Sequence, residues 1–389
     1  RFSHALGVSH LARRMGTELI HNTPELNLDD SRREHFLNLL MAAGLLHDVC
    51  HTPWSHTLEP LFIELSGKDH MDVTRELLSG EVIWPIKGSG RIPEILNDYG
   101  IHPGDVSDLI SKRYQGPLFM QQMIFGEVDA DTLDYLCRDF TFTGVSFGHV
   151  DINRLLQTMV IRSDRIMFLV KGLQAVRDFL NARVEMYSSV YFHKKTRIAD
   201  LMCLRAARKS VIDLKEFQDF WIMTDDEFLS SLMTRSRSEY VRDIAWRLKY
   251  RQGLFKRVFH IEAGSVTALE KTFLKHVVRM GRTAREAANA LEQTICSRLN
   301  IPLDYVIVDL VSAAADVSES RFRELDILFV DKQNKKVSLW ELDRHFAEYI
   351  SVAQPSRSLL SVYVPEEYRD LCMDRLPRMM MTLVEKEEI

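Results

Sequence analysis

A largely apolar stretch, Phe36–Leu46, runs directly into His47-Asp48 and constrains the fold more than any other feature of the chain. A helix over residues 31–48 would be apolar almost all round in its second half, and such a helix belongs at the centre of a fold. The stretch is too short to span a bilayer, which takes roughly 18 or more apolar residues. We therefore expect a helical core around this segment, with ionisable side chains at its end.

Ionisable side chains crowd the segment that follows this helix. Residues 47–70 include His47, Asp48, His51, His56 and His70, although the whole chain has only 14 histidines. Polar groups at the end of an apolar helix need partners, and imidazole and carboxylate ligands suit Mg²⁺, Mn²⁺ or a first-row transition metal. A single His-Asp pair would indicate only an ion pair or a helix end. The clustering favours a metal site over that simpler interpretation.

Two further segments can supply metal ligands. His4 opens an amphipathic helix, and Asp131 lies in a helix predicted over residues 129–140. On that helix, Asp131, Tyr135 and Asp139 fall within about 80° of one another. The alternative interpretation of this face is a solvated acidic surface. Two histidines and two carboxylates would leave coordination positions open for water and a phosphate oxygen, as a catalytic metal requires.

Composition limits the other classes of function. The net charge of -5 argues against a whole-chain affinity for nucleic acid or membranes. The five cysteines are far apart and form no CxxC pair, which is typical of reduced thiols and predicts a cytoplasmic protein. No signal peptide is visible, and because the sequence opens on Arg1, we expect further residues before it.

Local patterns predict a mainly helical protein with a mixed α/β part at its C-terminal end. Residues 88–103 are rich in Gly and Pro and are predicted to form a connection. Long helices are expected over residues 170–187 and 196–217. Strands are expected over residues 305–311, 325–330 and 337–342, the last two as a hairpin. We place a boundary between residues 255 and 300, and we assign a helical domain to 1–255 and an α/β lobe to 256–389.

The motifs together resemble a known family. Arg1-Phe2-Ser3-His4, His47-Asp48 and Asp131 are similar to the H…HD…D signature of the HD superfamily of metal phosphohydrolases. Residues 1–8, 45–56 and 129–139 resemble the dNTP triphosphohydrolases, which include the sterile-alpha-motif/HD-domain enzyme and its bacterial relatives, and residues 142–148 and 186–193 fit the bacterial members. The resemblance implies a helical HD domain over residues 1–255 and a smaller α/β lobe, for oligomerisation or regulation, over residues 256–389.

The resemblance also implies roles for individual side chains. A divalent ion, whether Mg, Mn, Fe, Zn or Ni, would be bound by His4, His47, Asp48 and Asp131. The phosphate channel would be lined by His51, His56 and His70, with His56, supported by Glu59, protonating the leaving 5′ oxygen. Arg1 would contact the α-phosphate, Tyr135 and Asp139 would hold the deoxyribose, and Arg183 and Tyr191 would contact the distal phosphates or the sugar. The implied reaction converts a dNTP and water into a deoxynucleoside and triphosphate.

Departures from the family pattern leave alternatives open. Cys50 and Thr52 stand where glycine is common, and Thr132 stands where some relatives have a lysine that reaches phosphate. The chain could instead hydrolyse another nucleotide or a nucleic-acid end, for example in phage defence. It could also be a nucleotide-binding sensor or an assembly subunit with weak or no catalysis.

Partners are also implied by the family. Its members are typically homo-oligomers, often tetramers with allosteric nucleotide sites, so we expect a homo-oligomer that binds a nucleotide substrate and a nucleotide effector. The basic segment 235–257 is interpreted as a solvated helix face or, alternatively, as an effector or nucleic-acid surface. No membrane partner is expected.

Overall fold

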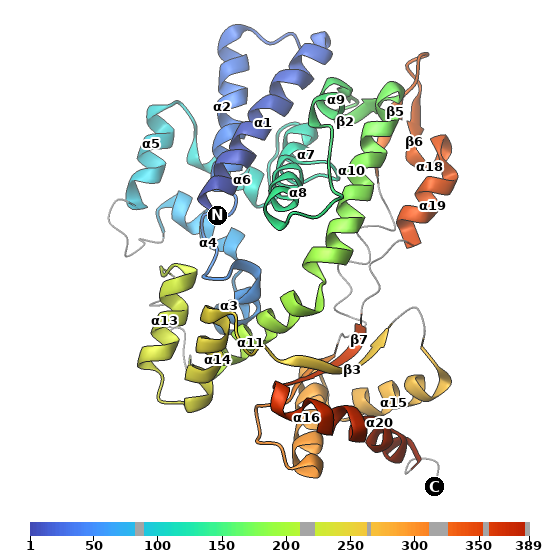
Figure 1. The fold of residues 1–389 in the computed structure, drawn as a ribbon. Coiled ribbons are helices and arrows are strands. Elements are labelled where there is room, and N and C mark those ends of the chain that lie inside the picture. The colour runs from blue at the N-terminus through green and yellow to red at the C-terminus, as the bar shows by residue number, and fades with distance from the viewer. Residues whose placement is uncertain (82–88, 211–221, 263–265, 311–325, 353–357, 386–389) are drawn as a thin grey trace. The chain divides into compact units, whose positions relative to one another are not determined.

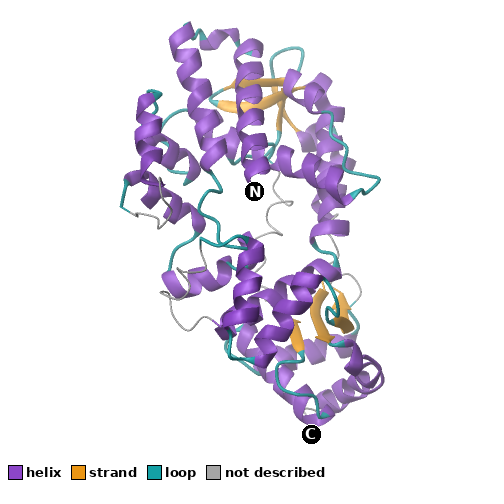
Figure 2. Ribbon diagram, turned by 60° about the vertical axis from the view of Figure 1, so that its left-hand side comes forward, coloured by secondary structure: helices purple, strands orange, loops and turns teal. Residues whose placement is uncertain are grey.

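The computed structural model describes residues 1–81, 89–210, 222–262, 266–310, 326–352 and 358–385. By their contacts these residues fall into two compact units. The first comprises Arg1–Tyr187 and Phe322–Ala353, and the second comprises Ser188–Arg321 and Gln354–Ile389. Helices dominate both units, and each also holds a small sheet (Figures 1 and 2). The predicted mainly helical fold with a smaller α/β part is confirmed, whereas the domain boundary at residue 255 stays a prediction.

The first unit is built around two long helices that lie side by side, α1 and α2 (Figure 1). Its helices are α1 (Phe2–Asn22), α2 (Asp30–Leu46), α3 (Glu59–Ser66), α4 (His70–Ser79), α5 (Ile92–Asp98), α6 (Pro103–Ile110), α7 (Leu118–Ile124), α8 (Ala130–Thr143), α9 (Ile152–Gln157), α10 (Leu173–Met186), α18 (Leu339–Leu342) and α19 (Arg344–Val352). Helix α2 is the predicted apolar helix, and its N-cap Asp29 accepts a hydrogen bond from the Arg32 amide. It buries Leu39, Leu40 and Ala43, so it does occupy the core.

The sheet of the first unit has the strand order β1-β2-β5-β6, with β1 at Met159–Arg162, β2 at Arg165–Leu169, β5 at Leu328–Val330 and β6 at Lys336–Ser338. Strands β2 and β5 are parallel, and the other pairs are antiparallel. The predicted hairpin is therefore present as β5 and β6. Its second strand ends at Ser338 rather than Leu342, because Ser338 and Glu341 form a capping box that starts helix α18.

The second unit packs helices against a separate antiparallel sheet of order β3-β7-β4. Its elements are α11 (Lys194–Ser210), α13 (Asp225–Arg235), α14 (Glu239–Tyr250), β3 (Lys256–Glu262), α15 (Ala268–Arg279), α16 (Ala284–Leu299), β4 (Ile307–Leu310), β7 (Ser358–Val364) and α20 (Arg369–Glu385). The sheet and helices α15, α16 and α20 share one apolar core that includes Leu291, Val308, Val362 and Leu376. Strand β4 lies inside the β-branched run predicted over residues 305–311.

Two predicted segments differ from the structure or extend beyond its described part. Residues 88–103 were expected to form a connection, but they contain helix α5, with Pro93 in its first turn and Gly100 in the left-handed region just after it. Pro and Gly here mark the two ends of a short helix. The helix predicted over residues 196–217 corresponds to α11, and residues 211–217 lie outside the described part of the chain. Within the described residues, no helix combines the length and the apolar character needed to cross a membrane.

Candidate metal centre

Three helix ends of the first unit bring the four predicted metal ligands together. His4 lies in the first turn of α1, and Asp131 lies in the first turn of α8. Helix α2 ends at Leu46, so His47 is its C-cap residue and Asp48 lies in the turn that follows. Because the helix ends just before His47 and Asp48, their side chains can point at the same place. In the middle of a helix, two adjacent side chains could not do so.

His4, His47 and Asp131 offer donor atoms at the spacing of ligands around one ion, and Asp48 lies beside them. The distance from His4 Nε2 to Asp131 Oδ1 is 3.1 Å, and from His47 Nε2 to the same oxygen it is 3.7 Å. Asp48 offers Oδ1 at 3.4 Å from His47 Nε2 and Oδ2 at 3.9 Å from His4 Nε2. Two ligand atoms about 2.1 Å from a tetrahedral ion would be about 3.4 Å apart. His4, His47 and Asp131 form one candidate metal-binding group, and Asp48 forms a second one with His51 and His70.

Hydrogen bonds behind the two imidazoles fix which ring nitrogen faces the group. His47 Nδ1 lies 2.9 Å from the Gly44 carbonyl, and His4 Nδ1 lies 2.7 Å from Asp134 Oδ2. Both partners are acceptors, so each Nδ1 donates a proton, and in the neutral ring that binds a metal the lone pair is on Nε2. His47 Nε2 is buried and makes no hydrogen bond within the described residues. Two lone pairs facing two carboxylates need a cation between them, so the residues fit a metal ion.

The electrostatics of the group also favour added positive charge. Burial opposes the charged form of His4, but hydrogen bonds and charges from Asp131 and Asp134 outweigh it and raise the pKa of His4 to about 9. The pKa of His47 is raised in the same way by Asp131 and Asp48. Burial opposes ionisation of Asp131, yet the two histidines hold its pKa below the usual value. The carboxylates thus stay ionised and draw cations or protons to the histidine nitrogens.

A second histidine group adjoins the first through Asp48. His51 Nε2 lies 3.4 Å from Asp48 Oδ1, and His70 Nε2 lies 3.9 Å from the same oxygen. The His51 and His70 rings are stacked with centroids 3.8 Å apart, and His56 meets His51 edge-on at 4.6 Å. Glu59 holds the outer two rings, accepting from His56 Nδ1 at 3.0 Å and from His70 Nδ1. All four residues predicted for the phosphate channel and its acid are therefore neighbours.

His51 and His56 differ in charge. Burial, with the charges of His70 and His56, lowers the pKa of His51 despite the opposing effect of Asp48, so His51 is neutral. His56 is exposed, and its hydrogen bond to Glu59 raises its pKa. Burial opposes ionisation of Glu59, but its histidine partners hold its pKa far below the usual range. The group thus offers a buried neutral donor and an exposed protonated acid side by side.

The loop that carries His51 and His56 is conformationally strained. Trp54 and Ser55 have φ of 59° and 45°, in the left-handed region that residues with a side chain rarely adopt. Thr52, at a position where the family often has glycine, is buried, and its carbonyl accepts the Ser55 amide at 2.9 Å. Backbone strain of this kind is found at functional sites, where surrounding contacts hold it in place.

Among the predicted substrate residues of the first unit, Arg1 borders the second histidine group. Arg1 Nη1 donates to the His51 carbonyl at 3.4 Å. Arg183 on α10 is buried, with Nη1 4.0 Å from Glu127 Oε2. Burial and the neighbouring Tyr187 raise the pKa of Tyr135 well above its usual value, while Arg183 opposes the shift, so Tyr135 is a neutral phenol beside a guanidinium.

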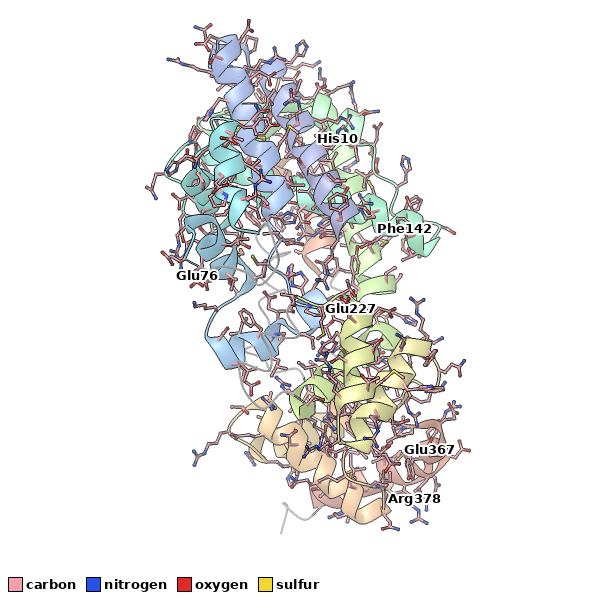
Figure 3. All side chains as sticks on the ribbon, turned by 90° about the vertical axis from the view of Figure 1, so that its left-hand side faces the viewer. His10, Glu76, Phe142, Glu227, Glu367 and Arg378 are labelled. Carbon is pink, nitrogen blue, oxygen red and sulfur yellow. The ribbon has the colours of Figure 1, made fainter. Side chains whose placement is uncertain are left out.

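Two further predicted substrate residues are Asp139 and Tyr191. Asp139 lies one turn beyond Tyr135 on α8, as the helical spacing predicted. Tyr191 belongs to the second unit, so its role at the distal phosphates or sugar stays a prediction. The family-like segment 142–148 follows the same helix: Phe142 projects from its last turn and is 81% exposed (Figure 3).

Two residues at the site were not identified from the sequence. Asp134 is the carboxylate behind His4, and Arg138 donates to both of its oxygens at 2.8 and 2.9 Å. Their i, i+4 spacing on α8 was a visible sign of an ion pair. Nothing in the sequence showed that this pair would face the first turn of α1.

Comparison with family models gives two matches that together cover most of the chain. The model described as "HD domain" matches residues 1–110, and the model described as "HD associated region" matches residues 150–388. His4, His47 and Asp48 fall in the first range, and Asp131 falls between the two.

Curated proteins include relatives of modest identity. The uncharacterized protein YwfO of Bacillus subtilis is 37% identical over 213 residues, which are 54% of this chain and 44% of that protein. A protein named deoxynucleoside triphosphate triphosphohydrolase SAMHD1 homolog, from Dictyostelium discoideum, is 28% identical over 258 residues, 61% of this chain and 46% of that protein. The chain thus spans about half the length of the curated relatives it matches.

Among solved structures, a hypothetical protein from Aquifex aeolicus superposes with a TM-score of 0.68 at 24% identity. The match covers 97% of this chain and 86% of that one. At this level of identity the likeness establishes the fold.

Proposed function

Because the chain belongs to the family in which an HD domain is followed by an HD-associated region, we propose that it is a metal-dependent phosphohydrolase that acts on deoxynucleoside triphosphates. The products would be a deoxynucleoside and triphosphate. The observation that carries the proposal is the convergence of His4 and His47 Nε2 on the carboxylates of Asp48 and Asp131, beside a second histidine group. The name of the Dictyostelium relative supports the choice of substrate.

The metal would be held by His4, His47, Asp48 and Asp131. When bound, it would polarise a phosphoryl oxygen and lower the pKa of a bound water towards neutrality. The chain's part is to keep both Nε2 lone pairs directed at one point through the hydrogen bonds of the two Nδ1 atoms. The donor set of two nitrogens and two oxygens suits several divalent ions.

The phosphates would lie along the histidine group. Arg1, beside His51, supplies a permanent positive charge for the α-phosphate, and Arg183 supplies another for the distal phosphates. His51 is neutral and buried, so it would act as a hydrogen-bond donor rather than as a charge. Fixed donors of this kind stabilise charge that develops on a phosphoryl group in the transition state.

His56 is the best-placed acid. Attack of water on the α-phosphorus breaks the bond to the 5′ oxygen, which leaves as an alkoxide and must receive a proton. The hydrogen bond that His56 donates to Glu59 favours the imidazolium, so His56 is protonated when the bond breaks. General acid catalysis by a positioned histidine typically contributes about 10²–10⁴-fold to the rate.

The sugar would lie against Tyr135 and Asp139. The Tyr135 ring would pack against a sugar that has no 2′-hydroxyl, and the Asp139 carboxylate would accept from the 3′-hydroxyl, as the family resemblance implies. For Tyr191, the family resemblance implies a contact with the distal phosphates or the sugar. The expected homo-oligomer, with nucleotide effectors bound in addition to substrate, is part of the same proposal and rests on the family resemblance.

An assay of the purified protein tests the proposal directly. Each dNTP and each NTP is incubated with the protein and Mg²⁺ or Mn²⁺, and the products are separated by ion-exchange chromatography. Release of triphosphate and deoxynucleoside from dNTPs, absent in His47→Ala, is the expected result. Release of diphosphate, monophosphate or ribonucleoside products would favour another nucleotide or a nucleic-acid end as substrate. Tight nucleotide binding without turnover would favour a sensor or an assembly subunit.

A further inference from the structure

We infer that Asp134 and Arg138 are positioning residues that lock the His4 imidazole with Nε2 directed at the metal centre, and that Gly7 supplies the space they need. The inference rests on the proposed metal site. Neither residue belongs to the four-ligand group, and both lie on the α8 face that packs against the first two turns of α1.

Asp134 determines the orientation of His4. Its Oδ2 lies 2.7 Å from His4 Nδ1, and its side chain is only 9% exposed. An ionised carboxylate can only accept, so the Nδ1 proton of His4 must point at Asp134. The opposite edge of the ring, with Nε2, then points at Asp131 Oδ1, 3.1 Å away. The two contacts fix both the tautomer and the ring angle.

Arg138 determines the orientation of Asp134. Its Nε donates to Oδ2 at 2.8 Å and its Nη2 to Oδ1 at 2.9 Å, a two-pronged contact that leaves the carboxylate little freedom to rotate. The same Nη2 donates to the Ser3 carbonyl at 2.8 Å. Arg138 therefore links the Asp134 carboxylate to the backbone next to His4. The positions of Asp134 and His4 are thereby both fixed relative to the start of α1.

Gly7 allows this close approach. A Cβ at residue 7 would lie 1.8 Å from Asp134 Oδ1, 2.6 Å from Asp134 Cγ and 2.7 Å from Arg138 Nη2. All three separations are far below van der Waals contact, so any larger residue would push the ion pair away from His4. Helix α1 continues through this position, where glycine costs about 1 kcal/mol relative to alanine. The space for Asp134 explains why a glycine fits here despite that cost.

The test is the affinity of the intact protein for Mn²⁺ and the absorption spectrum of its Co²⁺ form. Removing a hydrogen-bond partner of a metal ligand typically weakens metal affinity by about 10–100-fold. Arg138→Met and Gly7→Ala are each expected to lower Mn²⁺ affinity by about tenfold or more and to change the Co²⁺ spectrum. Arg138→Lys keeps the positive charge but loses the two-pronged contact with Asp134. Its Mn²⁺ affinity should fall between those of Arg138→Met and the wild type.

Arg13→Met is the matched control. Arg13 also reaches from α1 to a neighbouring helix, where it contacts Glu34 and Asn38, but it touches neither His4 nor Asp134. It should lose some stability and keep the wild-type affinity for Mn²⁺. Equal Mn²⁺ affinities and Co²⁺ spectra for wild type and Arg138→Met would overturn the positioning role alone, because the metal site would stand. A wild-type protein that binds no divalent metal would overturn the proposed function as well.

Discussion

Each compact unit contains buried ionic groups, but the groups are completed in different ways. In the second unit, Glu292 is paired with Arg205 and also accepts the Val308 amide at 2.8 Å, and Arg205 Nη1 donates to the Val306 carbonyl at 2.8 Å. In the first unit, two carboxylates face two imidazoles whose Nε2 atoms are turned inward, and one of these, on His47, makes no hydrogen bond within the described residues.

The comparison separates a scaffold from a site. Burial alone does not distinguish them, since Glu292 is 7% exposed and His47 is 2% exposed. Burial raises the pKa of Glu292 although Arg205 opposes the shift, while carboxylates raise that of His4 to about 9. What differs is whether the chain itself supplies the opposite charge. In the Glu292 group an arginine of the chain supplies the positive charge, and we call this group closed. The His4 group can accept a cation, and we call it open.

The largest expected effect comes from removing a ligand of the open group. Asp131→Ala should abolish turnover and weaken divalent-metal affinity by more than the roughly 100-fold seen when a partner of a metal ligand is removed, because an ionised ligand atom is lost. Calorimetric titration with Mn²⁺ and a triphosphate-release assay measure both. The matched control is Asp309→Ala, which removes the carboxylate bonded to Arg197 at 2.7 and 2.8 Å in the second unit. If both variants kept full metal affinity, Asp131 would not be a ligand.

The next effect should come from opening the closed group. Arg205→Met would leave Glu292 buried without its cation, which typically costs about 3–5 kcal/mol of unfolding free energy. Denaturation by urea measures the loss, and Mn²⁺ affinity should be unchanged. Replacing both partners, as in Arg205→Met with Glu292→Leu, should recover much of the stability because no charge is left unpaired. A single variant as stable as the wild type would show that the pair contributes nothing to the scaffold.

The sequence predicted a structural feature where the pattern that indicates it lies within one segment of the chain. Residues His47 and Asp48 follow an apolar helix, and that one pattern indicated both the central helix α2 and the ionisable group at its end. Pro93 and Gly100 led to a wrong prediction, because the same residue types mark loops and the ends of short helices. Pro93 lies in the first turn of α5, and Gly100 follows its end.

The pair behind His4 could not be predicted for another reason. Asp134 and Arg138 are one turn apart on α8, so the ion pair itself was visible. Its role depends on where α8 crosses α1, which is set by packing between segments more than 100 residues apart, and on the missing Cβ of Gly7 at that crossing. A single sequence carries the periodicity of each helix but not the crossing point of two.

The smallest expected effect concerns an ion pair that is closed, like that of Glu292, but exposed to water instead of buried. On α19, Arg344 Nε lies 3.0 Å from Glu348 Oε1, but the two side chains are 71% and 46% exposed. Water can solvate either partner alone, so Glu348→Ala should change the unfolding free energy by no more than about 0.5 kcal/mol and leave Mn²⁺ affinity unchanged. Urea denaturation in parallel with Arg205→Met gives the contrast. A loss as large as that of Arg205→Met would mean that pairing alone, without burial, stabilises the ionic groups of the scaffold.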